Sequence, residues 1–228
     1  MTILDTDFHC HILPGIDDGA KNTDESIRLI EMQLSQGIRH IVATPHYRMH
    51  ELGVREFLKR RADAFQKLQS AAAGSLPDIM LAAEIALEHN LCELEGIEKL
   101  ANERLNTLLI ELPYSGYRKW MSEEIEEIGY RTGMQIIIAH LDRYIDIFSA
   151  EDYSDILGIP EAIFQFNAST FERWKTKRLI KPLMKDDYPI IFGTDCHNTT
   201  TRKPDFTLLA KPLKGYEPEE RVSRLLQP

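Results

Sequence analysis

Seven short apolar runs recur along the chain, and each is six or seven residues long. Most are rich in isoleucine, valine or leucine and lack the alternation of apolar and polar residues that marks a half-exposed strand. Continuous apolar runs of this length are typical of strands in a parallel sheet whose two faces are both covered. The runs are ILDTDF (3–8), IRHIVAT (38–44), IMLAAEI (79–85), TLLIEL (107–112), QIIIAH (135–140), AIFQFN (162–167) and PIIFGTD (189–195).

The segments between these runs carry helix signals. Asn22, with Glu25 three residues later, resembles a capping box, and Gly37 is a suitable residue for ending that helix. Strands that alternate with helices predict an α/β fold with a parallel sheet. Seven such units in one domain, residues 1–228, favour a distorted (β/α)7 TIM-like barrel, and a doubly wound open sheet is the competing layout. The chain has neither GxGxxG nor GxxxxGK followed by Ser or Thr, so nucleotide-binding open sheets gain no support.

The charge and composition of the chain narrow the classes of partner. Its net charge is -9 with histidine neutral, which argues against general binding to nucleic acids or anionic membranes. The amino-terminal sequence has no basic end followed by a long apolar run, and no apolar stretch approaches the roughly 18 residues of a membrane span. Three cysteines do not make a disulfide framework. We therefore expect a cytoplasmic protein without direct membrane insertion.

Residues of metal-ligand type stand at the carboxyl ends of six of the seven predicted strands. In a barrel these ends open on one face, which is where active sites lie. His9 and His11 are two apart on an extended chain and point to the same side. Asp195 and His197 are expected to do the same, which leaves Cys196 pointing the other way. The ligand-type residues are His9, His11, Asp17, Asp18, His46, Glu84, Glu111, His140, Asp195 and His197.

The stretch TDCHNTTTR, residues 194–202, admits a second interpretation. Cys196 and Arg202 have the C-x5-R spacing of phosphatases that attack phosphate with a cysteine thiolate. A thiolate loop, however, curls backbone N–H groups around the phosphate, usually with the help of glycine. HNTTT, between the two residues, has no glycine and three β-branched threonines. The pattern favours a metal site, and a cysteine-dependent phosphatase using Cys196 and Arg202 is kept as an alternative.

Each ligand-type residue also has an ordinary structural interpretation. An isolated H-x-H is more often a pair of ordinary histidines, a strand-end glutamate is commonly solvated, and His140 alone suits a hydrogen-bonded core histidine. Five of the eight histidines nevertheless stand at predicted strand ends, and this concentration favours metal binding. His40, at the start of a strand, is expected to be structural, while His50 and His89 are expected at the surface.

Six motifs occur in an order that resembles a known family: DxHCHILPxxDDGA, ATPH, AEI, IEL, IAHxxR and DxHN. The chain resembles the bacterial metal-dependent protein-tyrosine phosphatases of capsule and exopolysaccharide gene clusters, within the polymerase-and-histidinol-phosphatase (PHP) superfamily. The resemblance covers roughly residues 5–205, and HILPGIDDGA separates this branch from histidinol phosphatases and polymerase domains. It implies a distorted (β/α)7 barrel with three divalent metal ions, manganese first and iron or zinc as alternatives.

The resemblance also implies a role for each matching position. The first metal would be held by His9, His11, Glu84 and Asp195, the second by Glu84, Glu111 and His140, and the third by Asp18, His46 and His197. In this assignment Glu84 bridges two metals. Asp17 is the alternative to Asp18 as a ligand, and the family pattern favours Asp18.

Two arginines match the pair that binds the phosphate in this family. These are Arg143 and Arg202, although a salt bridge to Asp142 or Asp146 is the structural alternative for Arg143. The family usually has H-P-E-R at the fifth strand, where this chain has His140-Leu141-Asp142-Arg143. The ligand and the arginine are kept, but the loss of proline and the shorter acidic side chain are expected to shift the approach of the arginine.

The activity implied by the resemblance is hydrolysis of phosphotyrosine in protein by a metal-bridged hydroxide. Clustered metals suit phosphate monoesters, whose uncatalysed hydrolysis is among the slowest reactions known. His46, His197 or Asp18 would supply a proton to the leaving group. The expected partner is the tyrosine-rich tail of a bacterial polysaccharide-assembly tyrosine kinase, which would make the enzyme a regulator of capsule and exopolysaccharide synthesis. A small-molecule phosphomonoesterase, acting for example on histidinol phosphate, and a non-catalytic metal-binding scaffold are the alternatives, and the sequence indicates no oligomeric state.

Overall fold

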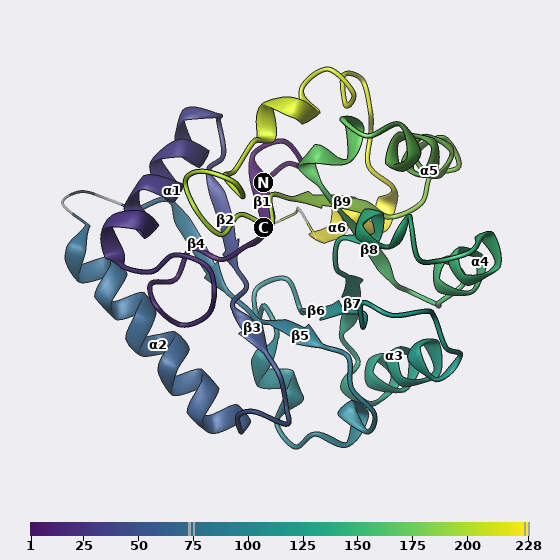
Figure 1. The fold of residues 1–228 in the computed structure, drawn as a ribbon, viewed down its shortest axis with the longest axis horizontal. Coiled ribbons are helices and arrows are strands. Elements are labelled where there is room, and N and C mark those ends of the chain that lie inside the picture. The colour runs from purple at the N-terminus through teal and green to yellow at the C-terminus, as the bar shows by residue number, and fades with distance from the viewer. Residues whose placement is uncertain (73, 75, 226, 228) are drawn as a thin grey trace.

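The computed structural model describes residues 1–72, 74, 76–225 and 227. Over these residues the chain forms nine β-strands and six α-helices (Figure 1). The strands are β1 (Thr6–Cys10), β2 (His40–Ala43), β3 (His46–Tyr47), β4 (Asp78–Leu81), β5 (Glu84–Ala86), β6 (Thr107–Glu111), β7 (Gln135–Ile138), β8 (Ile163–Asn167) and β9 (Ile190–Gly193). The helices are α1 (Thr23–Ser35), α2 (Val54–Ala71), α3 (Trp120–Thr132), α4 (Ala150–Leu157), α5 (Trp174–Lys185) and α6 (Glu220–Leu225).

Each of the seven predicted apolar runs contains a strand, and every strand pair is parallel, so the parallel α/β prediction is confirmed. Two strand positions are divided, into β2 and β3 and into β4 and β5. Pro45 lies at the first break, and proline interrupts a ladder because it has no N–H group. The N–H groups of Ala82 and Glu84 donate to the carbonyls of Ala43 (2.9 Å) and Pro45 (3.0 Å), so the backbones stay paired across both breaks.

The strands lie in two sheets, one with the order β1-β2-β4 and the other with the order β3-β5-β6-β7-β8-β9. At the other junction the N–H of Asp195 donates to the carbonyl of His9 (2.8 Å) and that of His11 to the carbonyl of Cys196 (2.9 Å). The expected barrel is thus not present as one closed sheet among the described residues. The breaks coincide with Pro45 and with the left-handed backbone of Asp195, which has a φ of 51°.

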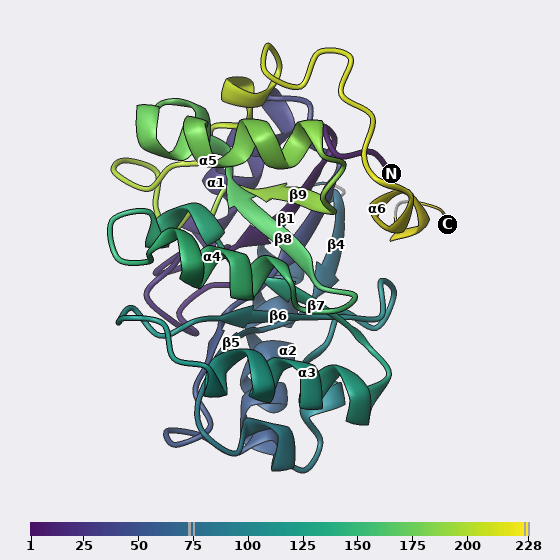
Figure 2. The ribbon, with the colours of Figure 1, turned by 90° about the vertical axis from the view of Figure 1, so that its right-hand side faces the viewer.

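The helices α1 to α5 lie around the outside of the strands, and α2 and α5 lie on opposite sides of the molecule in both views (Figures 1 and 2). The buried apolar side chains form one cluster. The predicted helix after Asn22 is confirmed as α1, whose first turn is capped by the Asn22 side chain, which accepts from the N–H of Glu25 (3.0 Å). None of the described helices has the length and apolar character needed to cross a membrane.

Candidate metal centre

Five histidine rings gather at the ends of the strands. His9 lies near the end of β1, and His11 follows that strand. His46 is the first residue of β3, while His140 comes after β7 and His197 after β9. The ring centroids of His11 and His197 are 3.9 Å apart, and those of His11 and His46 are 4.5 Å apart. All but His46 are almost completely buried. So many buried imidazoles in contact indicate a common ligand, since in an ordinary core each ring would have its own hydrogen-bond partner.

Glu84 lies at the centre of this group and is 1% exposed. Its Oε2 atom is 3.2 Å from His9 Nε2, 3.3 Å from His11 Nε2 and 2.9 Å from His46 Nδ1. Its Oε1 atom is 2.8 Å from His140 Nε2. One carboxylate therefore faces four imidazoles from three strand positions, β1, β3 and β7, which is the geometry expected of a bridging ligand.

Asp195 forms a second centre on the neighbouring side. Its Oδ1 atom is 3.5 Å from His11 Nε2 and 3.6 Å from His197 Nδ1. Two guanidinium groups approach the same carboxylate: Arg143 reaches Oδ2 at 2.7 Å and Arg202 reaches Oδ1 at 2.8 Å. The two predicted phosphate-binding arginines thus converge on one predicted ligand.

Asp17 and Asp18 take different places in the loop after β1. The Asp18 carboxylate is 3.3 Å from His46 Nε2 and 3.4 Å from His197 Nε2, and it is largely exposed. Asp17 instead accepts from His11 Nδ1 (2.8 Å) and from the backbone N–H of His46 (3.0 Å). Asp17 therefore holds the His11 ring through Nδ1, the nitrogen that faces away from the cluster, as a carboxylate does for a metal-bound imidazole. Asp18 instead faces the cluster.

Glu111, at the end of β6, completes the group on the far side of Glu84. Its Oε1 atom is 3.5 Å from His140 Nε2 and 2.9 Å from Arg143 Nη1. The structural alternative for Arg143, a salt bridge to Asp142 or Asp146, is not formed among the described residues. Asp146 pairs with other basic side chains at the surface, and Asp142 accepts a backbone N–H inside.

Two of the predicted ligands have positive φ angles, which non-glycine residues rarely adopt. The values are 28° for His140 and 51° for Asp195. The expectation that Asp195 and His197 share one side of an extended strand is therefore wrong, because β9 ends at Gly193 and the chain turns through a left-handed residue. The outcome of that expectation still holds: both side chains face the cluster and Cys196 faces away. Unusual backbone of this kind is concentrated at functional sites.

The segment after Cys196 cannot act as a thiolate loop in this conformation. The side-chain oxygen of Asn198 accepts from the N–H groups of Thr200 (2.9 Å), Thr201 (2.8 Å) and Arg202 (3.1 Å). The N–H groups that would bind a phosphate are thus occupied within the loop. Cys196 itself is fully buried beside Cys10, on the side of the backbone away from the cluster. The cysteine-dependent alternative lacks both an accessible thiol and an anion-binding loop.

Opposite charges compensate one another within the cluster. Burial by itself would raise the pKa of Glu84, but the surrounding histidines hold that pKa well below its ordinary range. Burial would lower the pKa of His140, yet hydrogen bonds with Glu111 and Glu84 raise it to about 9. His197 differs, because burial and the neighbouring His11 lower its pKa to about 4. Its ring is therefore neutral near pH 7, which is the form in which imidazole binds a metal.

The donor set fits divalent metal ions. Two buried atoms in it, Glu84 Oε2 and His197 Nε2, make no hydrogen bond of good geometry with the described residues, although they lie 2.9 Å from His46 Nδ1 and 3.4 Å from Asp18 Oδ1. A cation would satisfy both atoms, because each directs a lone pair toward the space that it shares with other imidazole nitrogens and carboxylate oxygens. Mixed imidazole and carboxylate donors suit manganese, iron or zinc. Three groups have all their donor atoms within 4.8 Å of one another: His11, Asp18, His46 and His197; His9, His11 and Glu84; and His46, Glu84 and Glu111.

A fourth group, formed by Asp7, Cys10 and Cys196, lies behind the cluster. The Asp7 carboxylate accepts from the backbone N–H (2.9 Å) and the hydroxyl (2.6 Å) of Thr194, and burial raises its pKa to about 6. The Cys10 thiol donates to the carbonyl of Val42 (3.4 Å). These partners account for Asp7 and Cys10, so the group is packing that ties β1 to β9.

The other three histidines lie outside the cluster, as predicted. His40 pairs with Asp78 at the start of β2 (2.7 Å). His50 is exposed and pairs with Glu88 (2.8 Å). The His89 ring lies against Trp120, with ring centroids 3.8 Å apart.

Sequence reasoning missed the residues that support the ligands from β8. Gln165 is fully buried, and its Oε1 atom lies 3.0 Å from His9 Nδ1 and accepts from the N–H of His140 at 2.6 Å. Asn167, two residues along, donates to Asp195 Oδ2 at 3.4 Å. The available signal was the pair of amides in AIFQFN, which are two apart on an otherwise apolar strand and so point to the same side.

Gly193 supports His9 by being small. A Cβ atom at this position would lie 2.5 Å from His9 Cβ and 2.9 Å from His9 N. We expect Gly193→Ala to displace His9 and to lower the free energy of unfolding by about 1–3 kcal/mol, which thermal unfolding would measure. Gly53→Ala is the control, because Gly53 has a φ of -71° and no neighbour within 4 Å of an added Cβ. Equal effects of the two substitutions would contradict this account.

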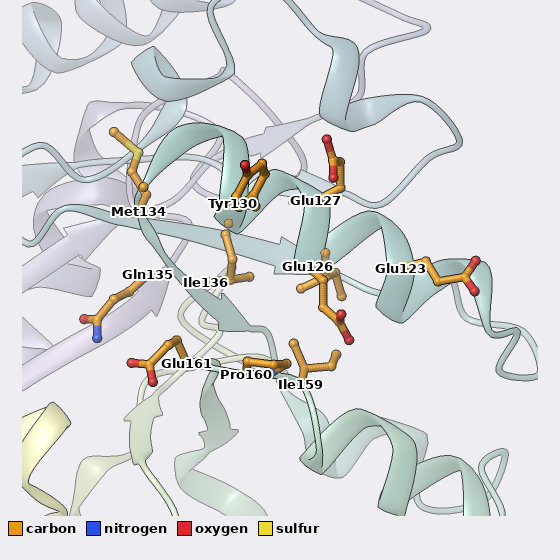
Figure 3. Close-up of a pocket in the computed structure, with 13 residues that line it drawn as sticks. Glu123, Glu126, Glu127, Tyr130, Met134, Gln135, Ile136, Ile159, Pro160 and Glu161 are labelled. Atoms are coloured by element: carbon orange, nitrogen blue, oxygen red, sulfur yellow. The ribbon is translucent and has the colours of Figure 1, made fainter.

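A depression of about 740 Å³ lies far from the cluster (Figure 3). It is lined by α3, by the start of β7 and by the turn before β8, whereas the cluster lies at the other ends of these strands. Its side chains include Glu123, Glu126, Glu127 and Glu161, so it repels phosphate. The concave surface that matters for an anionic substrate is therefore a different one.

Comparison with known proteins shows which family the chain belongs to. The family model for capsular polysaccharide synthesis, CpsB/CapC, matches residues 5–227. The chain belongs to this family. Tyrosine-protein phosphatase CpsB of Streptococcus pneumoniae is 28% identical over 210 residues, which are 87% of this chain and 85% of that protein. Putative tyrosine-protein phosphatase CapC of Staphylococcus aureus is 27% identical over 207 residues, 86% of this chain and 78% of that protein.

A solved structure has the same fold as this chain. It comes from work on YwqE from Bacillus subtilis and CpsB from Streptococcus pneumoniae, described there as unique metal-dependent tyrosine phosphatases. The match has a TM-score of 0.73 and 23% sequence identity, and it covers 97% of this chain and 91% of the other. The mixed α/β fold is therefore shared, and the resemblance carried by the six sequence motifs is confirmed.

Proposed function

We propose that this protein is a metal-dependent protein-tyrosine phosphatase that regulates capsule or exopolysaccharide synthesis. One observation carries the proposal: Glu84 and Asp195 each face several imidazoles, and Arg143 and Arg202 meet at Asp195 on the rim of the same cluster. A metal site alone would not need two arginines with free N–H groups. Cationic arginines beside clustered metals suit a phosphate monoester, whose charge must be neutralised during hydrolysis.

The ligand assignment that we propose is the one implied by the family resemblance. The groups of neighbouring donor atoms overlap with it, and they also place His11 beside Asp18, His46 and His197, and His46 beside Glu84 and Glu111. His9, His11, Glu84 and Asp195 would hold one ion, Glu84, Glu111 and His140 a second, and Asp18, His46 and His197 a third. When bound, divalent ions supply Lewis acidity, which lowers the pKa of water toward neutrality and offsets the charge on the phosphate. Manganese is the first candidate, with iron and zinc as alternatives, because nitrogen and oxygen donors are mixed and thiolates are absent from the set.

The two arginines would bind and orient the phosphate. Their side chains are 31% (Arg143) and 38% (Arg202) exposed, so each keeps N–H groups directed toward solvent after bonding to Asp195. A planar guanidinium binds two phosphate oxygens at once. Because the two side chains reach Asp195 through different oxygens, they would hold a phosphate from two sides and fix the direction in which its ester bond points.

The leaving group makes modest demands on proton transfer. A tyrosine phenol has a pKa of about 10, so its phenolate leaves more easily than an alkoxide. Asp18 and His46 are the more exposed of the three predicted proton donors, whereas His197 is almost completely buried and its lowered pKa leaves the ring neutral near pH 7. Asp18 and His46 are therefore the candidates for giving a proton to the departing oxygen or to solvent.

The surface beside the cluster suits a polypeptide. A depression of about 450 Å³ includes Asp195, Arg202 and Asn167, and its other lining residues are of both charges, among them Lys203, Glu172 and Asp205, together with Ser169. Ser169 and Lys203 belong to segments at the surface, so an extended chain can enter from the side. We propose the tyrosine-rich tail of a polysaccharide-assembly kinase as substrate, a cytoplasmic location, and a single-domain distorted (β/α)7 barrel of the PHP type.

Hydrolysis of an aryl phosphate by three proteins tests the proposal. We expect Cys196→Ser to retain most of the wild-type activity, because the thiol faces away from the cluster. His9→Ala is expected to lower kcat/KM by about a hundredfold or more, since it removes a metal ligand. A chelator should abolish the activity of the wild type and of Cys196→Ser, and added Mn²⁺ should restore it.

The same assay separates the alternatives. An inactive Cys196→Ser protein that is still folded, with a wild type that tolerates the chelator, would replace this proposal with thiolate chemistry. Faster turnover of histidinol phosphate than of a phosphotyrosine peptide would indicate a small-molecule phosphatase. A protein that binds Mn²⁺ but hydrolyses no phosphoester would be a metal-binding scaffold.

A further inference from the structure

Helix α5 (Trp174–Lys185) is strongly basic in a chain whose net charge is -9. Three of its lysines, Lys177, Lys181 and Lys185, follow one another at intervals of four residues and so lie on one stripe of the helix. We call them the lysine stripe. The opposite face of α5 is buried against the strands, so the stripe is the side that the helix presents outward.

The lysine stripe has no acidic partner in the part of the chain that the structure describes. None of its ammonium groups lies within 4.0 Å of a carboxylate, whereas Lys175, on the same helix, pairs with Asp146. Like charges four residues apart on a helix destabilise it. The first turn of α5 also has no acidic residue to complement the helix dipole. Among the described residues, no ion pair therefore offsets the charge of the lysine stripe.

The stripe lines a depression of about 560 Å³. Lys211 supplies a fourth ammonium group from the opposite wall, and the apolar lining consists of Phe171, Met184 and Pro212. Four cations around an apolar floor match a ligand that combines an aromatic ring with a dianion. A phosphotyrosine side chain has this combination, since its phosphate carries a charge of about -1.5 to -2 at pH 7.

This depression is the neighbour of the one that begins at Asp195. The short 3-10 helix Ala168–Phe171 and residues 205–212 contribute to both, while the middle and end of α5, from Lys177 to Lys185, line the depression at the stripe. Ala168 and Leu208 line the depression at the cluster, and Phe171 and Lys211 line the one at the stripe. An extended polypeptide that places one residue at the cluster would continue into the second depression.

We propose that the lysine stripe is a second phosphate-binding subsite, which takes another phosphotyrosine of the same polypeptide while the first is hydrolysed. This inference rests on the proposed function and specifies its substrate as a chain with more than one phosphotyrosine. An anionic membrane is the less favoured occupant, because Ile180 and Leu183 on the apolar face of α5 are already buried. Trp174 is exposed, but it is a single residue with Arg178 over its ring and not an apolar face that could enter lipid.

Two peptides of the same sequence test the subsite, one with two phosphotyrosines a few residues apart and one with a single phosphotyrosine. We expect wild type to favour the doubly phosphorylated peptide by about tenfold in kcat/KM, through KM, because several partly exposed ion pairs each contribute modestly to binding. Replacing the lysine stripe with glutamine (K177Q/K181Q/K185Q) should remove this preference and leave turnover of phenyl phosphate unchanged. The preference should also fall with added salt, since the Debye length is only about 10 Å at 0.1 M.

A matched triple variant on the other side of the molecule is the control. R55Q/K59Q/K67Q makes the same change in charge on exposed positions of α2 and should keep the preference. A preference that survives in the stripe variant, or that is lost equally in the α2 variant, would overturn the proposal. So would binding of phosphatidylglycerol vesicles that depends on the stripe in a protein without peptide preference.

Failure of the subsite can be told apart from failure of the proposed function. If wild type hydrolyses no phosphate at all, the phosphatase assignment fails. Fluorescence anisotropy of the doubly phosphorylated peptide then still reports on the stripe, because binding does not require turnover. Tighter binding by wild type than by the stripe variant would support the subsite, and equal binding would overturn it.

Discussion

Glu84→Gln is expected to lower kcat/KM for an aryl phosphate by on the order of a thousandfold, because metal-held charge stabilisation contributes several kcal/mol. The side chain keeps its shape but loses the charge that faces four imidazoles at 2.8–3.3 Å. The new amide group would also direct N–H atoms at one or more of these rings. Two of the three proposed metal ions share this carboxylate, so the bound metal per protein should fall together with the activity.

Metal content by elemental analysis and kcat/KM on the same preparations would check this prediction. Glu88→Gln is the matched control, since Glu88 is a partly buried glutamate that pairs with His50 outside the cluster. Its metal content and activity should equal those of wild type. A Glu84→Gln protein with full metal content and near-normal turnover would show that the carboxylate neither bridges metals nor controls the reaction.

Glu84 also shows why much of this site can be predicted from sequence. It follows an apolar run, as His46, Glu111 and His140 do, and the carboxyl ends of parallel strands meet on one face whatever the helices between them do. The direction of the strands and the place of the ligand on each strand therefore suffice to bring distant residues together. That local rule predicted the strand-end side chains that the structure gathers, whereas the choice of Asp18 over Asp17 and the family itself came from the order of six motifs.

What the sequence did not predict depends on contacts between distant segments. The break at Pro45 leaves β2 and β3 separate, so the strands lie in two sheets and the seven similar units do not form one closed sheet among the described residues. The left-handed turn at Asp195 is held by hydrogen bonds to β1, which strand patterns do not encode. Gln165 supports His9 from a strand 156 residues away, and only the folded sheet brings the two side chains together.

The same limit applies to α5. Its basic residues are visible in the sequence, but their meaning depends on which of them find acidic partners. Lys175 does, at Asp146, and the lysine stripe does not. Sequence patterning predicts that a helix is charged, whereas only the fold indicates whether that charge remains available to a partner.

Substituting either arginine of the cluster is the second change with a large expected effect. Arg143→Ala and Arg202→Ala should each lower kcat/KM by about 10²–10³, the loss found when one preorganised donor to a developing negative charge is removed. Metal content should stay at the wild-type value, because neither guanidinium belongs to the donor set. Arg173→Ala is the control, since Arg173 is an exposed arginine that pairs with Asp146.

The lysine variants of the same positions distinguish charge from geometry. Arg143→Lys and Arg202→Lys keep the cation but lose the planar pair of N–H groups, so a site that needs bidentate binding of phosphate should recover little activity. The test is most direct at Arg143. Its Nη1 atom lies 2.9 Å from Glu111 and its Nη2 atom 2.7 Å from Asp195, and a single ammonium group cannot reproduce both contacts. Full activity of both lysine variants would mean that the arginines act only as background charge, and metal loss in the alanine variants would mean that they stabilise the ligands and do not bind the substrate.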